Sequence, residues 1–281
     1  MAAVGRRPRD RVPVAGASRW SAALVLALAL ALAAQRVSLL HGVSTVLFVH
    51  AHPDDETIAT GALIAELVAR GIRVSLLTAT RGEQGEVVPG PLSVLEGTDA
   101  LTRERERELA GAAATLGIDG RFWLGMPPAR ATGLPPRAYQ DSGMTWIRPG
   151  LAGPADDIDD DALVRAPLGE VTADVAALIG LLEPALVISY DNGGGYGHPD
   201  HVRMHEAAVA ASRVAGVAFA EVVHSEVDDA EWFDLSAHLA TVTDALRCHA
   251  SQLTVDGDGA HIVHSGGQRD PIITAVGLRP L

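Results

Sequence analysis

Short runs of strand-forming residues alternate along this chain with longer stretches of helical periodicity. Each apolar run is bounded by polar or turn-forming residues, which is typical of strands buried on both faces of a parallel sheet. The expected strands are 45–51, 73–80, 121–125, 185–191 and 218–227, and the expected helices are 56–70, 99–116, 160–182, 202–214 and 235–252. The alternation predicts an α/β fold: a Rossmann-like open, mostly parallel sheet with helices on both faces.

Polar clusters follow three of the expected strands. HPDDE follows the first strand, RGEQGE the second and NGGGYGHPDH the fourth. Ligands of open α/β sheets bind outside the carboxyl ends of the strands, so these clusters should meet at one edge of the sheet. The proline- and glycine-rich stretch 125–161 lacks periodicity, which is typical of a lid, a binding loop or a disordered segment.

Residues 1–41 have the composition of a targeting segment. Five arginines and one aspartate lie within the first 20 positions, and an uninterrupted apolar run, 22–34, follows them. This is the pattern of a positively charged n-region and a hydrophobic h-region. We therefore divide the chain into a signal or anchor segment, 1–41, and one catalytic domain, 42–281. The arginines should stay in the cytoplasm while the domain is exported.

Two fates of this segment remain open. Cleavage near 31–34 would release the domain, whereas retention of an apolar run extended to Leu40 would anchor it to the membrane. If translation starts after the segment, the domain would be cytoplasmic instead.

The charge balance disfavours nucleic acid and anionic lipid as partners of the domain. The formal net charge is −13, and basic residues are concentrated in the n-region. A domain more acidic than the whole chain should repel polyanions. Cys248 is the single cysteine, which excludes an internal disulfide. The sequence does not indicate an oligomeric state.

The clustered acids of HPDDE require a positive partner, because adjacent carboxylates repel one another. His52 and Asp55 lie three positions apart where a strand turns into a helix, so they can converge above the sheet. The second cluster places His198, Asp200 and His201 at the same edge. Two histidines and one aspartate with an open fourth position favour a catalytic zinc site, and the same ligand types could hold non-haem iron. The sequence therefore predicts Zn²⁺, with Fe²⁺ as the alternative.

The motifs HAHPDDE and GYGHPDHV resemble the signatures of the PIG-L/LmbE family of zinc-dependent de-N-acetylases. The likeness covers about residues 45–255 and is strongest to the mycothiol-pathway branch, whose members remove acetyl from an N-acetylglucosaminyl-inositol. RGEQGEVV (81–88), DSGM (141–144) and HASQ (249–252) resemble segments of that branch. The resemblance implies an LmbE-like fold and an amidohydrolase activity.

The resemblance also implies a role for individual residues. The zinc ligands would be His52, Asp55 and His201. Asp54 would be the general base that takes a proton from the attacking water. His198 would be the cationic partner of the oxyanion or of the departing amine, oriented by Asp200, with Tyr196 approaching the same oxygen. The residues that would hold sugar hydroxyls are Glu83, Arg105 and Asp141.

We therefore expect a zinc-dependent hydrolase that removes N-acetyl groups from an amino-sugar-containing glycan, glycolipid or glycoside. One alternative is a non-catalytic sugar-binding protein on the same fold, and another is a non-haem-iron enzyme. The mycothiol enzymes are cytosolic and have no such leader, so an exported relative would meet a different substrate. The sequence leaves the acceptor sugar open.

Overall fold

The computed structural model describes residue 2 and residues 38–281, and the predicted n-region and apolar run lie outside this part of the chain. The chain divides at His41/Gly42 into two units, and the second, Gly42–Leu281, carries the elements considered below. Within the described residues, no helix combines the length and apolar character needed to cross a bilayer.

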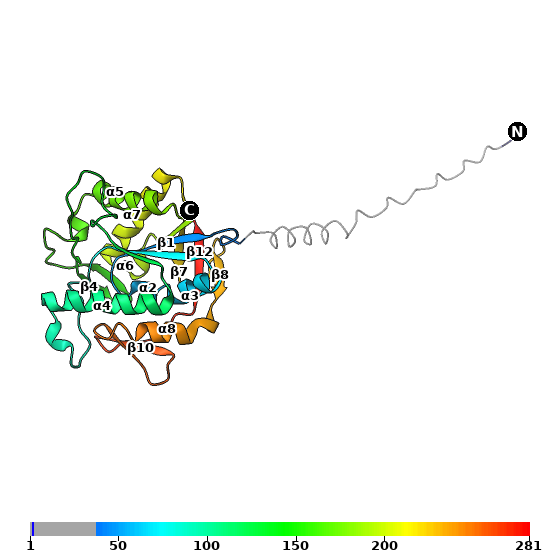
Figure 1. The fold of residues 1–281 in the computed structure, drawn as a ribbon. Coiled ribbons are helices and arrows are strands. Elements are labelled where there is room, and N and C mark those ends of the chain that lie inside the picture. The colour runs from blue at the N-terminus through cyan, green and yellow to red at the C-terminus, as the bar shows by residue number, and fades with distance from the viewer. Residues whose placement is uncertain (1, 3–37) are drawn as a thin grey trace. The chain divides into compact units, whose positions relative to one another are not determined.

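A mixed sheet forms the centre of the 42–281 domain (Figure 1). Within the described residues it has seven strands in the order β3 (Gly120–Trp123), β2 (Arg73–Thr78), β1 (Thr45–His50), β6 (Leu186–Tyr190), β7 (Ala218–Val223), β12 (Ala275–Pro280) and β8 (Glu231–Asp234). The first five strands run parallel, with Val46 of β1 opposite Val74 on one side and Leu186 on the other. β12 runs antiparallel to both β7 and β8.

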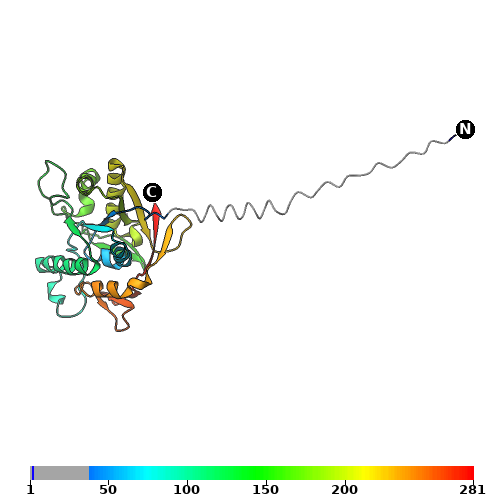
Figure 2. The ribbon, with the colours of Figure 1, turned by 45° about the vertical axis from the view of Figure 1, so that its right-hand side comes forward.

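Helices cover both faces of the sheet. α5 (Leu168–Leu182) and α7 (Pro199–Ala215) pack together on one face, and α3 (Gly61–Ala69), α4 (Asp99–Leu116) and α8 (Leu239–Leu246) pack on the other (Figure 2). The side chains of β1 are therefore buried on both faces, which explains its unbroken apolar run. Leu47 and Val49 contribute to a core that includes Val171, Val175 and Met204 of the covering helices. The predicted α/β class and parallel sheet are confirmed.

Three predicted helices differ from the observed ones. The helix expected at 56–70 is interrupted between α2 (Asp55–Ile58) and α3, where the Thr60 hydroxyl donates to the Glu56 carbonyl. The helix expected at 160–182 begins only at Leu168, because Pro167 disfavours helical backbone at the residue before it. The helix expected at 235–252 is reduced to α8, preceded by the 3-10 turn Ser236–His238.

Several strands were not predicted. β8 and β12 extend the sheet beyond the parallel part, and the stretch 125–161 contains a hairpin of β4 (Met144–Arg148) and β5 (Leu151–Pro154). A small sheet of β9 (Leu253–Val255), β10 (His261–His264) and β11 (Arg269–Pro271) follows α8. These strands are short and antiparallel, so their pairing depends on tertiary contacts more than on an apolar run.

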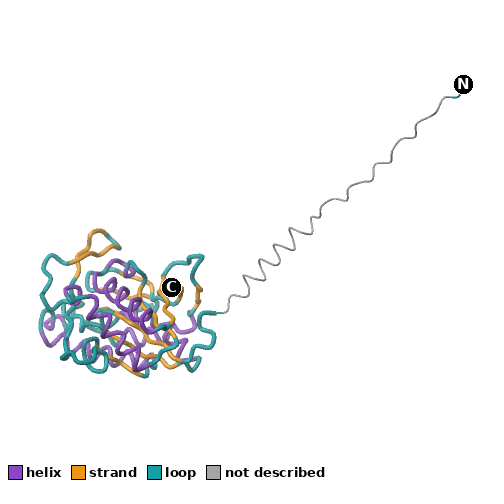
Figure 3. Tube along the Cα trace, turned by 90° about the horizontal axis from the view of Figure 1, so that it is seen from above, coloured by secondary structure: helices purple, strands orange, loops and turns teal. Residues whose placement is uncertain are grey.

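The strand order creates a crevice at the carboxyl ends of β1 and β6. From β1 the chain continues outward to β2 and β3, while β6 and β7 lie on the other side, so the direction of winding reverses between β1 and β6. Long loops connect the helices and strands around this layered core (Figure 3). Such a reversal point is where open α/β sheets bind ligands.

Candidate active site and metal centre

The turn after β1 presents His52 and Asp55 to the crevice. The His52 backbone N–H donates to Asp55 Oδ2 at 2.8 Å, which closes the turn before α2 begins. Asp54, between them, has φ 120°, a conformation that only glycine adopts without strain. Strain of this kind persists where surrounding contacts over-determine the backbone, and it concentrates at functional sites.

His201 reaches the same point from the first turns of α7. Its Nδ1 donates to the Gly194 carbonyl at 3.2 Å, a pairing that leaves the Nε2 lone pair free to bind a cation. The ring stacks on Tyr190 with centroids 4.1 Å apart and planes 8° apart. The Tyr190 hydroxyl in turn donates to Asp55 Oδ2 at 2.6 Å. Tyr190 therefore orients one side chain from each of the two motifs.

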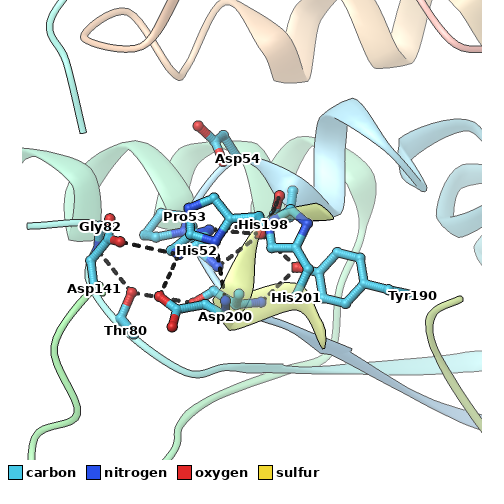
Figure 4. A network of polar contacts seen from close by, with 12 residues as sticks. His52, Pro53, Asp54, Thr80, Gly82, Asp141, Tyr190, His198, Asp200 and His201 are labelled. Carbon is cyan, nitrogen blue, oxygen red and sulfur yellow. Dashed lines mark hydrogen bonds and ion pairs between the residues drawn. The ribbon is translucent and has the colours of Figure 1, made fainter. Parts of the chain in front are cut away.

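Ring nitrogens of His52 and His201, both labelled in Figure 4, lie close to the two carboxylate oxygens of Asp55. His201 Nε2 lies 3.3 Å from His52 Nδ1 and 3.3 Å from Asp55 Oδ1, and His52 Nδ1 lies 3.4 Å from Asp55 Oδ2. Around a tetrahedral ion, ligand atoms lie about 1.63 bond lengths apart, so bonds of about 2.0–2.1 Å to zinc require separations of about 3.3–3.4 Å. The separations of His201 Nε2 from His52 Nδ1 and from Asp55 Oδ1 have this size, so these atoms are spaced as zinc ligands would be.

The other nitrogen of His52 faces two carboxylates. His52 Nε2 lies 3.2 Å from Asp200 Oδ2 and 3.5 Å from Asp141 Oδ1. Asp200 is fully buried and also accepts from the backbone N–H and the hydroxyl of Ser142. A carboxylate behind a histidine fixes the tautomer and orientation of a metal ligand.

Two other groups of three possible ligands also include His52. The donor atoms of His52, His198 and His201 lie within 4.8 Å of one another, as do those of His52, Asp141 and Asp200. Because His52 Nε2 is engaged by carboxylates, its Nδ1 is the atom available to an ion. This favours the triad with Asp55 and His201 as the primary ligands.

The pKa of His52 is raised by the carboxylates around it. Burial by itself would lower this pKa, but the carboxylates of Asp141, Asp200 and Asp55 outweigh burial and hold it well above its ordinary value. The pKa of Asp55 is held well below its usual range, against the effect of burial, by His201 and His52. The raised pKa means that His52 favours its protonated form, so a bound metal ion would have to displace a proton from it.

Ion binding should consequently release close to one proton per ion at pH 7, because His52 must give up its Nδ1 proton to become a ligand. The release should fall towards zero as pH rises through the raised pKa of His52. Calorimetric titration with ZnCl₂ in two buffers of different ionisation enthalpy measures it. Asp200→Asn should reduce the release and weaken ion affinity by about 10- to 100-fold. A proton count of zero at pH 7 would contradict this assignment.

The Asp54 carboxylate is bound by Arg105. The Arg105 guanidinium donates to the Pro53 carbonyl at 2.6 Å, to Asp54 Oδ2 at 3.1 Å and to the Gly82 carbonyl at 2.8 Å. A Cβ on Gly82 would lie 1.9 Å from Arg105 Nη1, which explains why RGEQGE needs a glycine there. Burial and repulsion from Asp55 raise the pKa of Asp54 to about 6, although Arg105 opposes the rise. A carboxylate with this pKa is suited to accept a proton near neutral pH.

Arg105 was expected to contact sugar. Its side chain is only 3% exposed, and its terminal nitrogens bind backbone carbonyls and Asp54. The structure therefore places it under the HPDDE turn as a support for that turn. Contact with sugar stays a prediction.

His198 differs from expectation in its charge and in its partner. Its Nδ1 accepts the backbone N–H of Asp200 at 3.2 Å, so the neutral ring carries its proton on Nε2. Burial, with the neighbouring rings of His52 and His201, lowers the pKa of His198 to about 2. The lowered pKa favours a neutral His198 ring with an Nε2–H to donate, and the carboxylate of Asp200 contacts His52.

The remaining predicted residues lie around the same crevice. The Tyr196 ring lies 5.2 Å from the His201 ring and 6.1 Å from the His198 ring. The Glu83 carboxylate accepts the backbone N–H of Asp141 at 2.9 Å, so it braces the DSGM segment. The structure thus brings every predicted site residue to one edge of the sheet.

Sequence reasoning missed three supporting residues. Tyr190 and Ser142 hold Asp55 and Asp200, and Glu56 accepts the backbone N–H of Asp54 at 3.0 Å. Glu56 also pairs with His249 at 2.9 Å, both side chains being fully buried. The position of Tyr190 at the end of a strand that leads into the second motif was the signal available for it.

Comparison with known proteins places this site in context. The family model described as GlcNAc-PI de-N-acetylase (PIG-L) matches residues 47–212. A 1D-myo-inositol 2-acetamido-2-deoxy-alpha-D-glucopyranoside deacetylase of Kineococcus radiotolerans is 49% identical over 166 residues, which cover 59% of this chain and 44% of that protein. The chain thus spans less than half the length of that relative.

A deacetylase of the same description from Mycolicibacterium vanbaalenii is 36% identical over 264 residues, covering 81% of this chain and 87% of that protein. Among solved structures, N,N'-diacetylchitobiose deacetylase from Pyrococcus horikoshii superimposes with a TM-score of 0.56 at 20% identity, covering 83% of this chain and 80% of that one. At this identity the likeness concerns the fold alone.

Proposed function

Because the chain belongs to the PIG-L family of de-N-acetylases, we propose that it is a metal-dependent amidohydrolase that removes the acetyl group from an acetylated amino sugar. The observation that carries this proposal is the convergence of His52, Asp55 and His201, with His201 Nε2 at zinc-ligand spacing from His52 Nδ1 and Asp55 Oδ1. Three protein ligands leave a position open, as in catalytic rather than structural zinc sites.

The ion would be held by His52 Nδ1, His201 Nε2 and the Asp55 carboxylate. Bound there, a dication supplies a Lewis acid and lowers the pKa of a coordinated water. Zn²⁺ is the proposed ion, and Fe²⁺ is the alternative that the same ligand types allow.

The chain's own side chains supply the proton transfers. The Asp54 carboxylate takes a proton from the attacking water and passes it to the amide nitrogen as the C–N bond breaks. His198 donates its Nε2–H to the carbonyl oxygen while that oxygen gains negative charge. Tyr196, whose ring centroid lies 6.1 Å from that of His198, is proposed to approach the same oxygen. The products are acetate and the free amine of the sugar.

The experiment that tests the proposal measures acetate release and metal content together. Residues 42–281 should release acetate from 1D-myo-inositol 2-acetamido-2-deoxy-alpha-D-glucopyranoside, N,N'-diacetylchitobiose or another N-acetyl sugar. A chelator should abolish this activity, and one equivalent of Zn²⁺ should restore it. Folded, zinc-loaded protein that binds sugar without releasing acetate would instead indicate a sugar-binding protein. Activity that needs Fe²⁺ and oxygen would indicate a non-haem-iron enzyme.

The location of the domain is a separate proposal. The basic n-region and the apolar run at 22–34 support export, with or without retention of the segment as an anchor. Mass spectrometry of the mature N-terminus tests it, and a start after residue 41 in a cytoplasmic fraction would overturn it. An exported enzyme would act on an envelope glycan, glycolipid or glycoside.

A further inference from the structure

The peptide bond between Pro53 and Asp54, both labelled in Figure 4, is held at both of its polar groups. Its carbonyl, on Pro53, accepts from Arg105 Nη2 at 2.6 Å. Its N–H, on Asp54, donates to Glu56 Oε2 at 3.0 Å. Because a peptide unit is planar, these two contacts fix the orientation of the whole plane, and with it the φ angle of Asp54.

The observed orientation of this peptide is the strained one. Asp54 has φ 120° and ψ −32°. If the plane turned over with its two Cα atoms in place, φ would become about −60° at the same ψ, which are the angles of a right-handed α-helix. The common type I and type II turns differ by the same reversal. Reversal would add Asp54 to α2 and relieve its strain, so other contacts have to oppose it.

Glu56 opposes the reversal because a carboxylate can only accept hydrogen bonds. It accepts the Asp54 N–H and also the ring N–H of His249, whose Nε2 lies 2.9 Å from Glu56 Oε1. In the reversed peptide the Pro53 carbonyl would face this carboxylate, so that two acceptors would meet. The Asp54 N–H would at the same time face Arg105, so that two donors would meet. The side chains around the turn therefore select the strained orientation.

His249 is the partner that keeps Glu56 ionised. Both side chains are fully buried, and a buried carboxylate needs a partner that donates to it or carries positive charge. Among the described residues no hydrogen-bond partner is found for the other ring nitrogen of His249, so the ring bonds through Nε2. Ser251, two positions further on, is bound through its N–H and its hydroxyl to Glu108 of α4. The loop after α8 is thus fixed to the helix that carries Arg105.

We propose that Glu56, held by His249, is a positioning residue for Asp54, the proposed general base. It keeps the peptide plane before Asp54 in its strained orientation. In this orientation Arg105 Nη2 binds the Pro53 carbonyl and also Asp54 Oδ2, the latter at 3.1 Å. Reversal would remove this shared contact and separate the Asp54 carboxylate from its cation. The inference rests on the proposed function for its effect on catalysis, whereas the orientation of the peptide can be tested without a substrate.

A double variant tests the proposal. Glu56→Met with His249→Leu removes both partners of the buried pair, so the domain should still fold. Its crystal structure should show the reversed peptide, with Asp54 at φ about −60°, at least as a second conformer. kcat for acetate release should fall by about 10- to 100-fold, as for a catalytic group misplaced by about 1 Å. KM should not change, and metal analysis should still find one Zn²⁺ per chain.

Single variants complete the test. His249→Gln keeps an N–H donor for Glu56 and should retain most of kcat. Glu56→Gln, which can donate an amide N–H to the reversed carbonyl, should lower kcat and show the reversed peptide even if the double variant does not fold. His238→Leu is the matched control, because His238 forms a partly exposed pair of the same kind with Glu66 at 2.6 Å. It should leave kcat and the Asp54 backbone unchanged.

The outcomes separate the positioning role from the proposed function. Asp54 remaining at φ 120° in every copy of both Glu56 variants would overturn the proposal, as would a reversed peptide with full kcat. Equal losses of kcat in His249→Gln and in the double variant would also overturn it. If the unmodified protein releases acetate from no N-acetyl sugar, the proposed function fails, and the φ of Asp54 in the variants still decides whether Glu56 holds the peptide.

Discussion

Asp54→Asn should lower kcat for acetate release by about 10²- to 10⁴-fold, the contribution typical of a positioned general base. Asparagine keeps the shape of the side chain and tolerates positive φ better than most residues. It cannot take the proton from water. Because Asp54 is not among the three converging donors, the variant should still bind one ion per chain, as measured by metal analysis.

Measuring the stability of Asp54→Asn distinguishes a loss of catalysis from a loss of folding. The pKa of Asp54 is raised to about 6, so the folded metal-free protein favours the neutral carboxyl. Ionisation therefore costs stability, starting as pH rises above about 4 and complete above about 6. At pH 7 in chelator the removal of this cost opposes the loss of the Arg105 ion pair, and thermal unfolding should show the variant folded. Asp156→Asn, in the exposed loop, is the control, and an unchanged kcat in Asp54→Asn would remove Asp54 as the base.

Arg105→Met should lower the free energy of unfolding by about 3–5 kcal/mol, the range for breaking a buried ion pair by removing one partner. The substitution leaves the Pro53 and Gly82 carbonyls without their donor and Asp54 without its cation. kcat should fall as well, because the strained turn loses its support. Denaturant unfolding and steady-state kinetics measure both effects.

Arg107→Met is the matched control on the same helix. The Arg107 side chain is 67% exposed and pairs with Glu104 on the same helix, so its loss should change stability by no more than about 0.5 kcal/mol. If Arg105→Met instead kept full stability and raised KM alone, Arg105 would be a sugar contact rather than a support of the turn.

The order of the main elements could be predicted from the sequence, and the resemblance of two motifs to a known family implied which residues would bind the metal ion. The apolar run 45–51 and the periodic helix 99–116 are local patterns, and local patterns determine where strands and helices form. Once the strands are parallel, their carboxyl ends share one edge, so HPDDE and GHPDH must meet there. Two histidines and clustered carboxylates are side chains that typically bind a divalent metal ion.

Tertiary packing alone decided what each polar side chain contacts. His52 and Asp200 are 148 positions apart, and no pattern in either motif shows that this carboxylate faces His52 rather than His198. The burial of Arg105 beneath the turn depends on the approach of α4 to Gly82, and the exposure of Trp146 depends on a hairpin inside a stretch without periodicity. Which side chains become buried, and which hydrogen bonds they form, depends on which helices and strands pack together. The spacing of residues within one motif does not indicate its neighbours from another part of the chain.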